Sequence, residues 1–321
     1  MKGPAPKTPK PVEIAAALST DPLMGKSKAY ISRALAAKAA GSMGEYQLWA
    51  SLALELLGKA ALAKIHPCLV ADPQSFVSLF AAAGMTIGTD IKTIIAKTLF
   101  ERLTHVSKRF DKKTQEFCIN MSLKRNAELH SGEAPFEGVV ATSWEGRYWH
   151  TAEIILEASD SSLENWLGAD RAKAPKEVIA EYTHATEEAA KVRVQTAAEA
   201  FAERPKRERE EALSKAASLD TWTVRRSFRL VADDIWDTKC PACSSRSFLA
   251  GTKYNEEVSE DDDKESDEET VEASYVAEEF LCPSCGLHLD SRDAIAATGL
   301  DVDHVETETR QREYEPDYGN D

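Results

Sequence analysis

The chain has 321 residues, enough for two or three domains, and 43% of them are hydrophobic, which suffices for a buried core. No apolar run is long and uncharged enough to cross a bilayer, and no apolar segment of a secretory signal follows the basic N-terminus. We therefore expect a cytoplasmic protein with no membrane contact. Its six cysteines should be reduced thiols or metal ligands.

The net charge of −15 is concentrated at one end of the chain. Residues 231–321 contain 26 acidic and 7 basic residues, a net of −19. Residues 1–230 contain 28 acidic and 32 basic residues, a net of +4. The N-terminal part can therefore approach a polyanion such as RNA, whereas the C-terminal part would repel one.

Residues 1–25 are expected to form a flexible tail, because prolines and lysines are interspersed at its start. Residues 26–170 show a helical pattern and no β alternation. Apolar residues recur at three- and four-residue steps from residue 46 to 62, and His66-Pro67 should end that helix. Shorter helices are expected near residues 73–83, 90–108, 112–130 and 141–159. This predicts an all-α bundle.

The next segment, residues 171–219, is rich in Ala, Glu, Lys and Arg. Only Pro175 and Pro205 interrupt it. This composition is typical of one or two long, exposed helices, so we expect a helical arm after the bundle.

Residues 220–295 contain two Cys-x-x-Cys pairs, formed by Cys240 with Cys243 and by Cys282 with Cys285. Each pair can place two thiolates on one metal ion, and two pairs complete a tetrahedral site. The pairs bracket strand-like runs at 247–254 and 271–281. We predict a small β zinc ribbon with a structural Zn²⁺, because four thiolates leave no open position for catalysis. A redox or disulfide pair is the alternative.

Three other predictions concern the same region and the remaining cysteines. The dense acidic charge of residues 256–269 predicts a disordered loop inserted into the ribbon, and residues 296–321 should form a loose acidic tail. The ribbon or the acidic loop offers a place for a protein partner. Cys68 and Cys118 are expected to be small buried hydrophobic residues, and His288 a bystander of the metal site.

The helix expected at residues 112–130 ends with Arg125, Asn126 and His130. By chance, a chain of this composition contains about one Arg that is followed by a His with four to six residues between them. If an Asn must directly follow the Arg, the expected number of chance matches falls to about 0.02. Asn126 and His130 are four residues apart, so the amide can orient the imidazole. Arg125 and His130 are about 140° apart around a helix and do not point at one atom.

Residues 28–165 resemble the HEPN family, through the long helix YQLWASLALELLGKAALAKIHP and the later RNAELHSGE turn. The resemblance implies an all-α bundle that forms homodimers and cleaves RNA without a metal ion, as in toxin and antiviral defence systems. It implies Arg125 and His130 as the catalytic pair, with Asn126 in support. The fold class is therefore mainly α: an HEPN-like bundle and helical arm, followed by a small β zinc ribbon.

Two other readings of the motif remain open. Some HEPN domains lack nuclease activity, so the chain could be a dimerisation or interaction module with a zinc-ribbon adaptor. Alternatively, Arg125 and His130 are ordinary surface cations near a helix C-terminus, where they suit the helix dipole.

Overall fold

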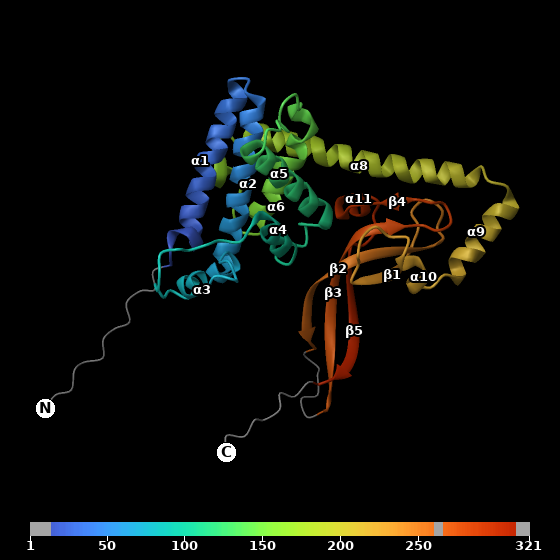
Figure 1. Ribbon diagram of the computed structural model, residues 1–321. Coiled ribbons are helices and arrows are strands. Elements are labelled where there is room, and N and C mark those ends of the chain that lie inside the picture. Colours follow the sequence, from blue (N-terminus) through green and yellow to red (C-terminus); the bar gives the residue numbers. More distant parts are fainter. Residues whose placement is uncertain (1–13, 260–265, 313–321) are drawn as a thin grey trace, which may run out of the picture. The chain divides into compact units, whose positions relative to one another are not determined.

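The computed structural model describes residues 14–259 and 266–312 (Figure 1). The chain divides into two compact units. The first contains Met1–Phe110 and Thr114–Tyr182, and the second contains Asp111–Lys113 and Thr183–Asp321. In the described residues, no helix is long and apolar enough to span a membrane. The predicted fold class is confirmed: helices make up the first unit, and an antiparallel sheet with a four-cysteine cluster lies in the second.

The first unit is built around a helical hairpin of α1 (Thr20–Ala39) and α2 (Met43–Ile65). Gly41 has a φ of +79° in the connecting turn, a conformation that glycine adopts without strain. As predicted, α2 ends directly before His66-Pro67. α1 begins inside the segment that was expected to be a flexible tail. Asp21 lies in its first turn, where a negative charge suits the helix dipole, and Leu18 and Leu23 are buried.

Further helices pack around this hairpin: η1 (Ala16–Leu18), η2 (Pro67–Leu69), α3 (Phe76–Ala82), α4 (Ala96–Thr104), α5 (Lys112–His130), η3 (Ala141–Ser143), α6 (Glu145–Glu157) and α7 (Leu163–Leu167). Tyr148 of α6 donates a hydrogen bond to the carbonyl of Ala50 at 3.0 Å. Trp166 of α7 donates to Ser27 at 3.0 Å, which in turn donates to the carbonyl of Ala53 at 2.8 Å. These buried hydrogen bonds fix the positions of α1, α6 and α7 relative to α2.

The segment predicted to form one or two long helices contains the long helix α8 (Lys173–Ala202) and the shorter α9 (Lys206–Ser218). Pro205 separates them, because proline cannot continue a helix but suits its beginning. A short helix, α10 (Thr221–Arg225), follows, with Asp220 accepting a hydrogen bond from the Thr223 amide at 2.6 Å.

The second unit contains an antiparallel sheet of β1 (Asp234–Lys239), β2 (Arg246–Val258), β3 (Glu268–Leu281), β4 (His288–Leu289) and β5 (Asp303–Gln311), plus the helix α11 (Arg292–Ala296). The strand order is β1-β2-β3-β4, and β5 pairs with the first half of β3. Alternate residues face opposite sides. Leu249 packs with Phe201 of α8 and the cysteines, whereas Phe248 packs with Val224 of α10.

The sheet extends further than the sequence indicates. β2 continues to Val258 and β3 begins at Glu268, so part of the expected acidic loop is strand; residues 260–265 lie outside the described residues. β5 lies in the expected acidic tail. Arg310 of β5 lies 2.8 Å from both Glu256 and Glu269, and its charge offsets theirs across the paired strands.

Candidate functional site

The four cysteines lie on two turns of the same construction, which we call the first knuckle (residues 240–245) and the second knuckle (residues 282–287). In each, the amide four residues after the first cysteine donates to that cysteine's carbonyl at 2.9 Å. In each, the first cysteine's amide donates at 2.9 Å to the carbonyl five residues on. Ser244 and Gly286 hold the left-handed position after the second cysteine, with φ of +59° and +82°.

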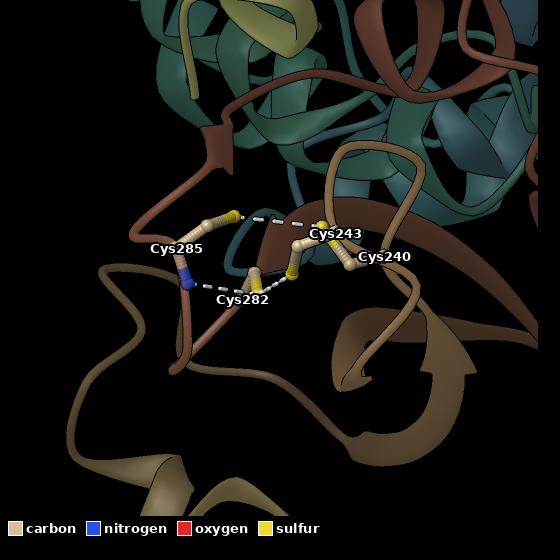
Figure 2. Close-up of side chains that lie close together, drawn as sticks. All are labelled: Cys240, Cys243, Cys282 and Cys285. Atoms are coloured by element: carbon tan, nitrogen blue, oxygen red, sulfur yellow. Dashed lines mark hydrogen bonds between the residues drawn. The ribbon is translucent and has the colours of Figure 1, made fainter. Parts of the chain in front are cut away.

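The two knuckles bring all four sulfur atoms together (Figure 2). The Sγ atoms of Cys240 and Cys285 are 3.6 Å apart, and so are those of Cys243 and Cys282. All four lie within 4.8 Å of one another. Zn–S bonds of about 2.3 Å in a tetrahedron put sulfur atoms about 3.8 Å apart. The donor set and its spacing therefore fit a Zn²⁺ ion.

Without a metal ion, the surroundings favour a thiolate at Cys282, whereas the pKa values of Cys240 and Cys285 are raised. The amides of Ala242 and Cys285 each donate to a sulfur at 3.4 Å, that of Cys240 and of Cys282 respectively. Hydrogen bonds from the neighbouring thiols of Cys240 and Cys285 lower the pKa of Cys282. The thiolate is the form that binds metal. Three of the four cysteines are buried, and four protein ligands close the site, so it is a structural zinc site, as predicted.

His288 and the two remaining cysteines are not part of the four-cysteine cluster. His288 lies 2.5 Å from the buried carboxylate of Glu279, which also accepts from the amide of Leu230 at 2.8 Å. Cys118 is buried, as expected. The same expectation was wrong for Cys68, which is exposed because it lies in the 3₁₀ turn that follows α2.

α5 carries the Arg125, Asn126 and His130 motif in its last turns. The Arg125 side chain points at α2, where its Nη2 lies 2.7 Å from Oε2 of Glu55. Each of these two side chains is only 14% exposed. Oε1 of Glu55 also lies 2.9 Å from Nζ of Lys59, one turn further along α2. The result is a buried cluster of two cations around one carboxylate, here named the Glu55 cluster (Glu55, Lys59 and Arg125).

Electrostatics in the Glu55 cluster outweigh desolvation. Burial alone would raise the pKa of Glu55, but the charges of Lys59 and Arg125 reverse this and lower it. Lys59 also donates to the Thr93 hydroxyl at 3.1 Å. Nε of Arg125 and Oε2 of Glu128, one turn apart on α5, are buried and have no hydrogen-bond partner among the described residues. A buried donor and a buried acceptor without partners are uncommon in folded proteins, and here both lie beside an ion pair.

Asn126 and His130 lie elsewhere on α5. Both are exposed, and the described residues include no hydrogen-bond or ion-pair partner for either side chain. Leu123, one turn before Asn126, is 59% exposed. One chain therefore does not bring His130 to Arg125, as the angle of about 140° between them requires.

Sequence reasoning did not identify Glu55 and Lys59 as part of this site. One feature of the sequence could have identified them: they are two opposite charges, four residues apart, inside the apolar run of α2. Because burying a charge is costly without a partner, such a pair predicts a third polar group from another helix. The sequence does not say which helix supplies it.

Comparison of the chain with protein-family models, curated proteins and solved structures finds no match.

Proposed function

We propose that the helical unit is a metal-independent endoribonuclease of the HEPN type, active as a homodimer in an antiviral defence or toxin system. Arg125 and His130 are its catalytic residues and Asn126 supports His130. The observation that carries the proposal is the Glu55 cluster, which holds the arginine of the motif in a fixed position at the end of α5.

Buried charge is the first line of support. Removing two cations and a carboxylate from water opposes folding unless their contacts compensate closely, and apolar side chains could fill the same space more simply. Charged clusters with shifted pKa values are typical of functional sites. Within the Glu55 cluster, the Nε atom of Arg125 is buried and has no hydrogen-bond partner among the described residues. A guanidinium has five donors in a planar fork, so one carboxylate leaves donors for a phosphate oxygen.

The exposed face of α5 is the second line of support. Leu123, Asn126 and His130 follow one another at steps of three and four residues and form one stripe, here called the α5 stripe. An exposed leucine between polar residues is the pattern of a helix that pairs with a partner. If two α5 stripes meet around a two-fold axis, both His130 side chains line one groove.

The chemistry follows from the residue types. The imidazole of His130 takes the proton of a ribose 2′-hydroxyl as a general base. The 2′-oxygen then bonds to the adjacent phosphorus, and the bond from phosphorus to the 5′-oxygen breaks. His130 of the partner subunit gives a proton to the leaving oxygen. Arg125 stabilises the charge on the phosphate in the transition state.

A specific observation favours the second candidate, a non-catalytic dimerisation module with the zinc ribbon as an adaptor for a protein partner. Arg125 already pairs with a carboxylate of its own chain and is 14% exposed. An arginine with a purely structural role would form the same buried ion pair within one chain.

Incubation of the purified, zinc-loaded protein with mixed RNAs in EDTA separates the two candidates. A nuclease yields new RNA ends that sequencing can map, and the adaptor module yields none. The matched variant is His130→Ala, because His130 has no partner among the described residues and its loss should leave the fold intact. Cleavage by the wild type but not by His130→Ala supports the nuclease.

A further inference from the structure

One face of the sheet in the second unit gathers metal-binding side chains that are not part of the four-cysteine cluster. Asp234 and Trp236 lie two residues apart on β1, and His304 and Glu306 lie two residues apart on β5. Residues at such spacing share a face of a strand. β1 and β5 do not pair with each other, because β2 and β3 lie between them. The side chains of Asp234, His304 and Glu306 nevertheless converge, each with one ligand atom within 4.8 Å of the others.

Gly251 on β2 makes this convergence possible. The register between β2 and β3 shifts between Ala250 and Gly251. A Cβ atom at Gly251 would lie 2.3 Å from the carbonyl oxygen of Val276 and 2.7 Å from Cη2 of Trp236, which no side chain tolerates. The indole of Trp236 therefore lies over the glycine and reaches across the sheet. It stacks on the ring of His304, with 4.7 Å between centroids and 11° between planes.

The stack fixes the His304 ring with Nε2 toward Asp234. Nε2 of His304 and Oδ2 of Asp234 are 4.0 Å apart, which is too long for a hydrogen bond. Two ligands of one tetrahedral ion, at bond lengths near 2.1 Å, lie about 3.4 Å apart. The distance of 4.0 Å between these two atoms is thus closer to the distance between two ligands of one metal ion than to the length of a hydrogen bond.

The local field at this face is negative. Tyr275 of β3 stands opposite His304 in the β3–β5 register. Asp234, Glu306 and Asp233 act on Tyr275 with negative charge, and Lys253 offsets part of it. Carboxylates collected in this way favour a bound cation.

We propose that Asp234, His304 and Glu306 form a second metal site, which binds a divalent transition-metal ion such as Zn²⁺. One imidazole and two carboxylates are ligands that Zn²⁺ accepts, and three protein ligands leave a coordination position for water or a small anion. Small rotations of Asp234 and Glu306 bring the ligand atoms to bonding distance. The ion ties β1 to β5 across two intervening strands. This site is independent of the proposed nuclease chemistry.

Metal counting on the full-length protein tests the proposal. The protein is loaded with one Zn²⁺ per chain at the four cysteines and dialysed against excess Zn²⁺, and bound zinc is measured by elemental analysis. We expect two ions per chain in the wild type. His304→Ala and Asp234→Asn should bind one. The control is His184→Ala on α8, an exposed histidine outside both clusters, which should still bind two.

Cobalt spectroscopy identifies the ligands of the second ion. Co²⁺ added to protein with zinc at the cysteines should give weak visible bands without thiolate charge transfer, and Asp234→Asn should abolish them. Asp234→Asn keeps the side-chain shape, and an unchanged near-ultraviolet circular dichroism spectrum shows that the variant is folded. One zinc per chain in the wild type, or two in folded Asp234→Asn, overturns the proposal.

Discussion

Arg125 of α5 and Glu55 of α2 are 70 residues apart in sequence, yet their charged groups meet at 2.7 Å in the interior of the helical unit. Lys59 completes the arrangement at 2.9 Å from the same carboxylate. A pair of this kind contributes little stability compared with apolar packing, but its members depend strongly on one another. Removing one partner leaves the other charge buried and uncompensated.

Glu55→Gln is therefore expected to destabilise the protein by about 3 kcal/mol, in the range for breaking a buried pair. The measurement is urea unfolding followed by circular dichroism at neutral pH. Glu188→Gln is the matched control, because Glu188 forms an ion pair with Lys191 on the surface of α8 and its loss should leave the midpoint unchanged. In a double-mutant cycle, the variant with both Glu55→Gln and Arg125→Met should lose less unfolding free energy than the sum of the losses in the two single variants. Additive costs would show that the two side chains are not coupled.

The same carboxylate predicts a pH dependence. The pKa of Glu55 is lowered in the folded protein, because the charges of Lys59 and Arg125 outweigh the effect of burial. A lowered pKa contributes stability above the unfolded value of about 4.3, and that contribution is lost as the pH falls through the folded value. The difference in unfolding free energy between wild type and Glu55→Gln should be constant near neutral pH and shrink below about pH 4. Urea unfolding at several pH values checks this, and a difference that grows on acidification contradicts it.

The knuckle geometry predicts one tightly bound zinc ion per chain and a sheet that depends on it. Cys282→Ser removes a buried ligand, so we expect loss of this zinc and of hydrogen-exchange protection in β2 and β3. Cys68→Ser is the control, since Cys68 is an exposed cysteine outside the cluster. It should keep both zinc and protection. A zinc-free wild type with a fully protected sheet would show that the cysteines do not hold a structural metal.

Local chemistry made much of this fold predictable. α2 ends where His66-Pro67 disfavours helix, and α9 begins after Pro205. The zinc site was predictable because each Cys-x-x-Cys turn is a local structure, which needs only a second copy nearby.

Features set by tertiary pairing were not predictable in the same way. β5 is exposed along almost all its length and shows no apolar alternation, so only its pairing with β3 and the contacts of Arg310 reveal it as a strand. Glu55 interrupts an apolar run, but nothing in the sequence identifies Arg125 as its partner. The convergence of Asp234 and His304 depends on a missing side chain at Gly251, two strands away from β5.

The α5 stripe predicts how the chain dimerises. Leu123 is 59% exposed beside Asn126 and His130, so Leu123→Glu would place charge in the interface and should yield monomers at micromolar concentration. Val192→Glu is the control, because Val192 has the same 59% exposure on α8 and lies outside the stripe. Light scattering measures the mass of each variant. A wild-type monomer that still cleaves RNA would contradict the dimeric site.

The proposed chemistry also predicts the ends of the reaction products. If His130 takes the proton of a 2′-hydroxyl, the cleaved RNA carries 2′,3′-cyclic phosphate and 5′-hydroxyl ends. DNA, which lacks that hydroxyl, should resist cleavage. EDTA should not inhibit over short incubations, because the proposed chemistry uses no metal ion. End-labelling and mass spectrometry of the fragments identify these ends.

Variants at the three motif positions should differ in a defined order. His130→Ala should lower the rate by about 10²–10⁴-fold, the usual contribution of a general acid or base, with fold and dimer intact. Arg125→Ala should lose activity, bind RNA less tightly and also lose stability, because it leaves Glu55 beside Lys59 alone. Asn126→Ala should have the smallest effect, since its role is to orient His130. Equal cleavage by wild type and His130→Ala, or a requirement for added magnesium, would refute the nuclease and leave the interaction module as the better explanation of the Glu55 cluster.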